Sequence, residues 1–247
     1  MRSLGHYGAV MGFFDFLQDN PRYAGRRLAI NRLNKRHRFL VRPYRSEIAG
    51  ARVLDLASHD GRWPYALSAA GAREVVGVEA RPEMIDQFAA YPEGEVKDRV
   101  RLVEGDVYVE LPRLIEAGET FDVVAVYGLL YHLTDHYGLL ALIARLRPRL
   151  IVIDSEFALS ADPVVRFAME STESHLNTIA HVPGQGAAPI GVPSRSAMEL
   201  MARSLGYETT WADWESLPER QRGGLASYYR QPPRWKRRDT CALRPVT

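Results

Sequence analysis

The chain has 247 residues, of which 46% are hydrophobic and 25% charged, a composition typical of one globular domain with a sizeable core. Its net charge of +2 gives no independent ground for a nucleic-acid partner, and one cysteine, Cys241, excludes an intrachain disulfide framework or a cysteine-rich zinc site. No stretch reaches the ~18–20 apolar residues of a membrane helix, and residues 1–16 lack the features of a signal peptide. We therefore expect a cytoplasmic protein with no membrane association.

Residues 1–45 are expected to form an N-terminal helical cap. The cluster from Phe13 to Leu17 favours an amphipathic segment packed on the core, and a flap over a bound ligand is the alternative. Basic residues recur from Arg22 to Arg45 with apolar residues at helical spacing between them. This pattern predicts a helix with a solvated basic face, and a strip that binds RNA or an anionic substrate is the alternative.

Residues 53–63, Val-Leu-Asp-Leu-Ala-Ser-His-Asp-Gly-Arg-Trp, predict a buried strand, a tight loop and a helix. This is how a nucleotide-binding βα unit begins. A short loop at the carboxyl end of a parallel strand lets backbone N–H groups approach a ligand, and Gly61 permits that approach. Asp60 is expected to help cap the following helix.

The next strands carry acidic residues at their carboxyl ends. Residues 74–79 end in Glu79, whose carboxylate can accept hydrogen bonds from both hydroxyls of a ribose. Residues 100–106 end in Asp106, which can accept from an exocyclic amino group such as that of adenine. Further strands are predicted over 121–128 and 150–154, so the chain is expected to be an α/β protein with a mainly parallel sheet.

The order of these motifs resembles the class I S-adenosylmethionine (SAM)-dependent methyltransferases over residues 46–158. The series is Leu-Asp-Leu-x-x-x-x-Gly, Val-Gly-Val-Glu, Glu-Gly-Asp-Val, Phe-Asp-Val-Val and Leu-Tyr-His-Leu. The resemblance implies a Rossmann-like sandwich with a seven-stranded sheet, an antiparallel last strand and helical lid segments. The first loop departs from the family, because Ala57 and His59 stand at glycine positions; a dinucleotide-dependent dehydrogenase is the alternative reading. The cofactor-binding residues that the methyltransferase resemblance implies are Asp55, Ala57, Ser58, Gly61, Glu79, Ala80, Asp106, Val107 and Tyr127.

The loop over residues 127–136 contains a candidate general base. Ligands of open α/β sheets lie outside the carboxyl ends of the strands, which places this loop beside the reacting group. His132 is a plausible general base, because an imidazole as a class of side chain is suited to proton transfer, and a role in ordering the loop is the alternative. On the first loop and helix, His59 and Tyr65 are candidates for contact with the acceptor.

Asp154 and Glu156 follow the fifth strand at alternate positions, so their carboxylates point the same way in an extended chain. A buried carboxylate needs a partner. Oxygen-rich pairs suit Mg²⁺, and metal-dependent sugar and catechol O-methyltransferases bind such a metal with acids at the ends of the fourth and fifth strands. Here the fourth strand ends in Tyr127, so the match is partial. Structural pairing, or a hydrogen bond to substrate, is the alternative.

Residues 159–193 are expected to form an insertion that covers the acceptor site as a lid. A helix is predicted from Pro163 to Leu176, followed by a Gly/Pro-rich loop. His175 and Asn177 are candidates for acceptor contacts, with an ordinary surface loop as the alternative. Residues 194–247 are expected to add a helix capped by Ser194 and a closing strand pair over 207–214 and 239–243.

These features predict a SAM-dependent methyltransferase that acts on a hydroxyl of a small polar acceptor, such as a sugar. A hydroxyl needs deprotonation by a base or by a bound metal such as Mg²⁺. The alternatives are a tRNA wobble-uridine carboxymethyltransferase, whose fourth-strand loop is similar to residues 127–132, and a non-catalytic SAM-binding interaction protein. A nucleic-acid partner is not the favoured reading, and a homodimer is compatible with the sequence. The predicted catalytic residues are Glu156, Asp154 and His132, with Asp154 and Glu156 as metal ligands.

Overall fold

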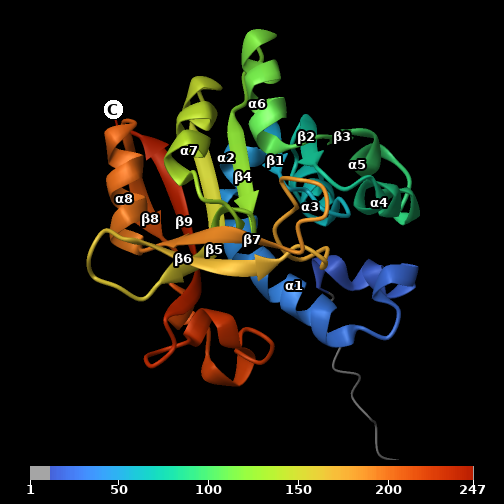
Figure 1. Cartoon of the computed structure of the whole chain (residues 1–247). Coiled ribbons are helices and arrows are strands. Elements are labelled where there is room, and N and C mark those ends of the chain that lie inside the picture. Colours follow the sequence, from blue (N-terminus) through green and yellow to red (C-terminus); the bar gives the residue numbers. More distant parts are fainter. Residues whose placement is uncertain (1–11, 247) are drawn as a thin grey trace, which may run out of the picture.

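The computed structural model of the protein describes residues 12–246 (Figure 1). A seven-stranded sheet with the order β3-β2-β1-β4-β5-β9-β8 forms its centre. Strands β1 to β5 run parallel, and β9 runs antiparallel to both β5 and β8. This is the predicted class I methyltransferase sandwich with an antiparallel last strand. The strands are β1 Arg52–Leu56, β2 Glu74–Glu79, β3 Val100–Glu104, β4 Val123–Tyr127, β5 Leu150–Ala158, β8 Tyr207–Trp211 and β9 Lys236–Pro245.

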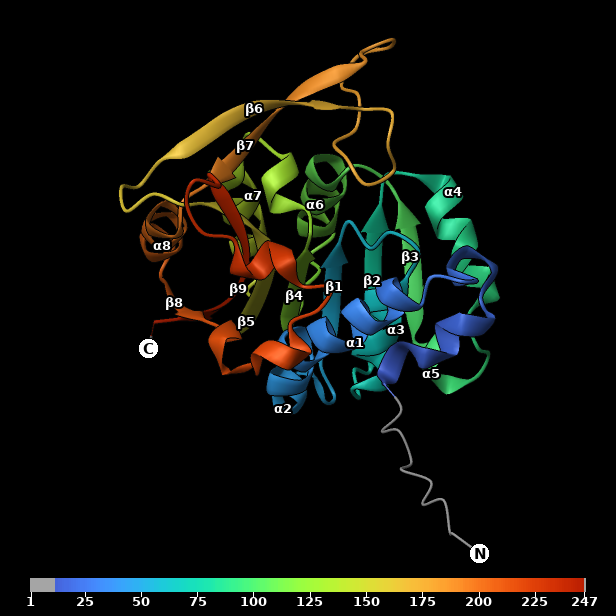
Figure 2. The ribbon, with the colours of Figure 1, turned by 90° about the horizontal axis from the view of Figure 1, so that it is seen from below.

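Helices cover both faces of this sheet, with α1, α2, α3 and α5 on one face and α6, α7 and α8 on the other (Figure 2). Because both faces are buried, the central strands are continuous apolar runs rather than alternating ones. None of the helices in residues 12–246 is long and apolar enough to cross a membrane. The α-helices are α1 Arg27–Leu40, α2 Arg45–Ile48, α3 Arg62–Ala69, α4 Pro82–Ile85, α5 Glu95–Asp98, α6 Val107–Glu116, α7 His136–Arg145 and α8 Arg195–Ser204.

The N-terminal segment packs onto the core as a helical layer. The 3₁₀ helix Phe13–Asp19 buries Phe14 and Leu17 completely, and α1 buries an apolar stripe against the same core. This agrees with the amphipathic segment predicted for the cluster from Phe13 to Leu17, and residues 1–11 lie outside the described residues.

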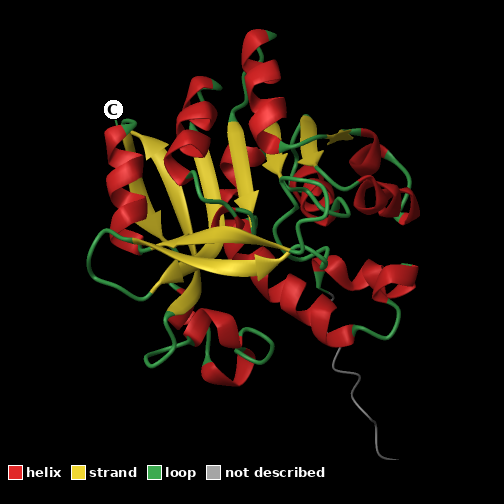
Figure 3. Ribbon diagram, in the orientation of Figure 1, coloured by secondary structure: helices red, strands yellow, loops and turns green. Residues whose placement is uncertain are grey.

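The helix predicted from Pro163 to Leu176 is wrong. Strand β6, Val165–Ser171, instead pairs antiparallel with β7, Ala187–Pro193, in a separate two-stranded sheet. Exposure alternates along β6 with a period of two: Phe167 and Met169 face solvent, while Ala168 and Glu170 face inward. The lid is therefore a β-arm, and the arm crosses the end of the main sheet to which the arrowheads of the parallel strands point (Figure 3).

The last part of the chain follows the prediction more closely. The Ser194 side chain accepts from the backbone N–H of Ala197 as the N-cap of α8, and β8 and β9 form the closing pair. Between these two strands, the chain folds into short 3₁₀ helices that pack beneath α1, with Lys35 donating to the carbonyl of Gly223. The 3₁₀ helices of the chain, besides the first, are Pro21–Tyr23, Arg42–Tyr44, Asp86–Ala90, Leu130–His132, Trp214–Ser216, Glu219–Gln221 and Ala226–Tyr229.

Candidate active site

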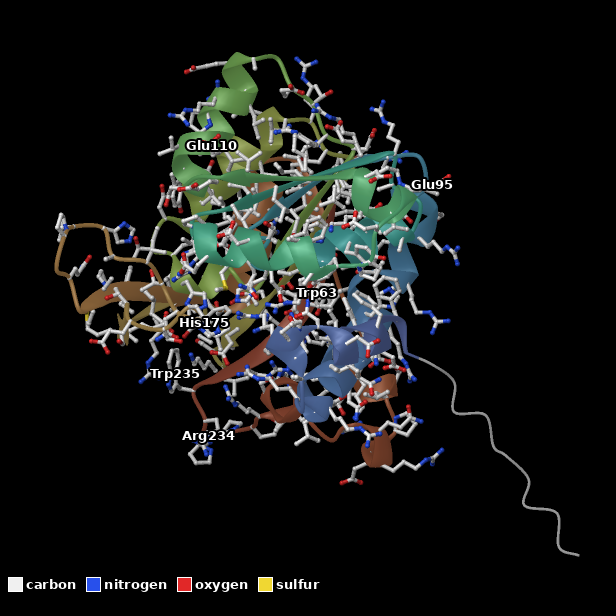
Figure 4. All side chains as sticks on the ribbon, turned by 90° about the vertical axis from the view of Figure 1, so that its right-hand side faces the viewer. Trp63, Glu95, Glu110, His175, Arg234 and Trp235 are labelled. Atoms are coloured by element: carbon white, nitrogen blue, oxygen red, sulfur yellow. The ribbon has the colours of Figure 1, made fainter. Side chains whose placement is uncertain are left out.

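A cavity of about 300 Å³ lies at the carboxyl ends of β1 to β4. Loops that follow these four strands form one side of it. Helix α1, the loop over 175–181 that follows β6, and residues from the last part of the chain form the other side. Figure 4 labels two residues of its wall, Trp63 next to the N-terminal helices and His175 beside the arm that contains β6 and β7. The fold therefore brings together the strand ends on which the sequence placed its candidate site.

The loop after β1 keeps a glycine-like backbone without the glycines. Ala57 has φ 60° and His59 has φ 55°, both in the left-handed region. Glu79 holds this loop, because its carboxylate accepts from the backbone N–H of His59 at 2.9 Å and from that of Arg81 at 3.0 Å. Burial, reinforced by the charge of Arg62, lowers the pKa of His59 to about 4, so this imidazole is neutral at physiological pH.

Asp60 does not cap helix α3, whose N-cap is Gly61 with no side-chain hydrogen bond. Its carboxylate instead accepts from the hydroxyl of Tyr23 at 2.5 Å and lies 3.3 Å from a guanidinium nitrogen of Arg62. Burial alone would raise the pKa of Asp60, but the charge of Arg62 and hydrogen bonds from neighbouring side chains hold it below its ordinary value. A buried polar network thus ties the N-terminal segment to the first loop.

The predicted cofactor-binding residues divide into two groups. Asp106 faces the cavity while its Oδ1 accepts from the backbone N–H of Tyr108 at 2.7 Å as the N-cap of α6. Asp55 lies behind the cavity wall, fully buried, with no hydrogen-bond partner for either oxygen among the described residues, and burial raises its pKa well above the ordinary value. The residues that line the cavity are Ala57, Glu79, Ala80, Asp106, Val107 and Tyr127, and those that do not are Asp55, Ser58 and Gly61.

His132 lines the cavity and is paired with a carboxylate from the β-arm. Its Nδ1 lies 2.6 Å from an oxygen of Glu170, which also accepts from the backbone N–H of Thr178 at 2.8 Å. Burial alone would raise the pKa of Glu170, but the hydrogen bond with His132 lowers it. With Nδ1–H donated to a carboxylate, the lone pair is on Nε2, so the arrangement orients an imidazole base.

Glu170 was missed by sequence reasoning because the segment that contains it was assigned to a helix. Along β6, Ala168 and Glu170 share one face, but the apolar Phe167 and Met169 lie on the exposed face, so the hydrophobic pattern of the sequence does not indicate this strand or its orientation.

Asp154 and Glu156 do not form the predicted metal site. Asp154 is fully buried and accepts from Arg36 at 2.7 Å, Arg238 at 2.5 Å, Tyr228 at 2.6 Å and Thr240 at 2.9 Å. Burial alone would raise its pKa, but the two guanidinium groups hold it below the ordinary value. These four donors occupy both oxygens, and the adjoining positive charge disfavours a cation.

Glu156 also departs from its predicted role as a catalytic residue and metal ligand. It lies outside the cavity lining and pairs with Arg230 at 2.7 Å and with Lys236. Within residues 12–246, no three histidine, cysteine, aspartate or glutamate side chains are grouped so as to hold a metal ion. The two predicted metal ligands are therefore structural ion-pair residues.

Three of the four residues predicted to contact the acceptor line the cavity. His59, His175 and Asn177 line the cavity, and the rings of the two histidines lie 5.7 Å apart. Tyr65, the fourth, does not line the cavity, so its predicted contact with the acceptor is wrong. Its ring packs against those of Phe16 and Tyr91, at centroid distances of 5.1 and 5.5 Å.

The comparisons agree with this fold. A family model described as a methyltransferase domain matches residues 53–149. No curated protein matches the chain. The structure is similar to the N-terminal domain of EvdMO1, solved in the presence of S-adenosylhomocysteine (SAH) and D-fucose, with a TM-score of 0.63 and 20% identity over 83% of this chain and 81% of that one.

Two further solved structures are described as SAM-dependent methyltransferases. One, called putative and from Listeria monocytogenes, has a TM-score of 0.59 and 13% identity over 89% of this chain and 100% of that one. The other, from Mesorhizobium loti, has a TM-score of 0.55 and 15% identity over 80% of this chain and 92% of that one. At these identities the likeness establishes the fold.

Proposed function

Because the chain carries a class I SAM-dependent methyltransferase domain, we propose that it transfers the methyl group of SAM to a hydroxyl of a small polar acceptor. The observation that carries the choice of a hydroxyl is the His132–Glu170 pair in the cavity wall. A hydroxyl is a poor nucleophile until it loses its proton, and this pair supplies an oriented base. The solved EvdMO1 domain, with SAH and D-fucose present, supports a sugar as one class of acceptor.

The residues of the strand ends fit SAM at one end of the cavity. Glu79 and Asp106 offer carboxylate oxygens to ribose hydroxyls and to an adenine amino group. SAM supplies an electrophilic methyl group on a sulfonium. The chain has to hold the acceptor oxygen in line with that methyl group and exclude water, which contributes much of the rate enhancement.

His132 then acts on the acceptor. Its Nε2 would take the hydroxyl proton as the carbon–oxygen bond forms and the methyl carbon–sulfur bond breaks to leave SAH, and Glu170 would stabilise the imidazolium through Nδ1. The proposal assigns no Mg²⁺ to Asp154 and Glu156, because both carboxylates already neutralise cationic side chains.

A tRNA substrate fits the structure less well. The basic residues of α1 do not form one free face, because Arg36 is buried against Asp154, Lys35 donates to Gly223 and Arg38 donates to Gln221. Sequence-independent RNA binding depends on several free cations aligned along one surface.

The test combines binding with turnover. We expect calorimetry to show binding of SAM and SAH, and SAM to methylate at least one member of a panel of monosaccharides that includes D-fucose. His132→Ala should then lower turnover by about 10²- to 10⁴-fold without changing SAM affinity. Glu170→Gln should lower turnover less than His132→Ala does and should shift the pH profile of turnover. The reason is that this substitution alters only the orientation and basicity of the imidazole.

Glu173→Gln is the matched control, because Glu173 is an exposed acid of the same arm and does not line the cavity. If SAM binds but no acceptor is methylated, or if His132→Ala retains full turnover, the assignment of a base-assisted methyltransferase fails. The non-catalytic SAM-binding interpretation would then replace it.

A further inference from the structure

The acceptor end of the cavity has more positive than negative charge. Arg36 and Arg238 both line the cavity and both donate to the single carboxylate of Asp154. The remaining lone pairs of Asp154 are taken by Tyr228 and Thr240. One carboxylate between two guanidinium groups leaves one positive charge uncompensated, and both guanidinium groups are largely buried, where that charge is poorly screened.

Arg32 adds a further positive charge to this end. It precedes Arg36 by four residues on α1, which places both side chains on the same face of the helix, and it lines the cavity. No carboxylate in residues 12–246 lies within ion-pair distance of Arg32. Arg32 is exposed to solvent on its outer side, and partial desolvation together with the charges of Arg36 and Arg238 lowers its pKa.

SAM does not neutralise this charge. Its sulfonium and ammonium groups together exceed its one carboxylate, so a bound cofactor leaves the cavity more positive than before. The negative charge must therefore come with the acceptor.

We propose that the acceptor is an anion, a hydroxyl compound bearing a carboxylate or phosphoryl group that Arg32, Arg36 and Arg238 hold. This inference rests on the proposed function and names the acceptor class of the same site. Guanidinium groups suit it, because their paired N–H donors match the spacing of oxygens on carboxylate and phosphoryl groups.

A glycine next to Arg238 leaves room for this guanidinium in the cavity wall. Gly128, with φ 89°, lines the cavity, and a Cβ built there would lie 3.2 Å from Nη2 of Arg238. The guanidinium also lies 5.6 Å from the ring centroid of Tyr131, the neighbour of His132. The anion site thus adjoins the base, so one small molecule can present its anion to the arginines and its hydroxyl to His132.

The experiment measures acceptor-site binding on SAH-saturated protein. Calorimetric titrations use D-glucose, D-glucuronate, D-glucose 6-phosphate and inorganic phosphate, the last as a probe that requires no sugar recognition. We expect the anions to bind about tenfold or more tightly than D-glucose, with affinity falling as salt rises. The two sugar anions distinguish a carboxylate from a phosphoryl preference.

Arg32→Gln removes one cation without breaking a described ion pair, so it should fold normally. It should weaken anion binding about five- to tenfold and leave SAH affinity unchanged. Arg38→Gln, on the same helix but outside the cavity lining, is the matched control and should alter neither. Arg238→Lys keeps the positive charge but loses the paired N–H donors of the guanidinium. It should weaken anion binding and have little effect on the affinity for D-glucose.

Equal affinity for D-glucose and the anions would overturn the inference. So would an Arg32→Gln variant that loses SAH affinity as strongly as anion affinity, since the arginines would then serve the cofactor's carboxylate. Failure of SAM and SAH to bind at all would instead contradict the proposed function. Methylation of a neutral sugar with no anion preference would leave that function standing and refute the anionic acceptor alone.

Discussion

The two ends of the cavity are built by different means. The end proposed for the cofactor is assembled from the loops that follow three neighbouring strands, within residues 57–107, and it contains the carboxylates of Glu79 and Asp106 as well as the guanidinium groups of Arg62 and Arg81. The acceptor end is assembled from segments far apart in the chain, as in the contact of Arg36 with Asp154, and its charge is basic. Local loops therefore build one end of the cavity, while long-range ion pairs build the other.

The largest expected effect tests the long-range network. Asp154→Asn leaves Arg36 and Arg238 with no buried counter-charge, so we expect a loss of about 3–5 kcal/mol in the free energy of unfolding, measured by urea denaturation. Glu156→Gln, two residues along the same strand, is the control. Its partners Arg230 and Lys236 are more exposed, so its loss should be below about 1 kcal/mol. Similar losses for the two variants would contradict the idea of a distinct buried network.

The next effect concerns His59, at the boundary between the two ends. Its pKa is about 4 in the folded chain against an ordinary 6.5, so between these values the unfolded chain binds the proton more readily. The stability due to neutral His59 is complete above pH 6.5 and is lost as the pH falls toward 4, where the loss reaches roughly 2–3 kcal/mol. His59→Asn tolerates the left-handed backbone without titrating. The difference in the free energy of unfolding between the parent chain and His59→Asn should become smaller as the pH falls from 6.5 toward 4. A difference that stays constant with pH would show that His59 is not the titrating group.

The smallest expected effect isolates the cofactor end. Asp106→Ala and Asp106→Ser both remove the carboxylate that faces the cavity, so each should weaken SAM binding by about 1–3 kcal/mol in calorimetry. Only the alanine variant also removes the N-cap of α6, at a cost of about 1 kcal/mol in stability. Unchanged SAM affinity in both variants would remove Asp106 from the cofactor site, and anion binding at the other end should not respond to either.

What could be predicted from the sequence follows the same division. The strand ends were predictable, because one residue after a buried strand has a defined position at the edge of a parallel sheet; Glu79 and Asp106 are examples. His132 was predictable for the same reason. Ala57 and His59 were identified as glycine replacements, and the structure shows that both adopt the left-handed backbone that this requires.

The partners of these residues were not predictable in the same way. Asp154 was expected to need a counter-charge, but nothing local indicates that it comes from Arg36 on α1 and Arg238 on β9. A metal ion and an arginine side chain are both suitable partners for a buried carboxylate. Only the tertiary contacts decide which of the two is present. Glu170 was obscured because a short segment of mixed polarity fits a helical and a strand period almost equally, and only its pairing with β7 resolves the choice.

The β-arm gives the molecule a modular character. The imidazole of His132 follows β4 of the main sheet, whereas the carboxylate that pairs with it belongs to a two-stranded sheet paired apart from the core. Under the proposed function, a change in this arm would alter both the choice of acceptor and the basicity of His132. The strand-end loops proposed to bind SAM would stay unchanged. With such a division, one core domain could combine with different arms and so act on different acceptors.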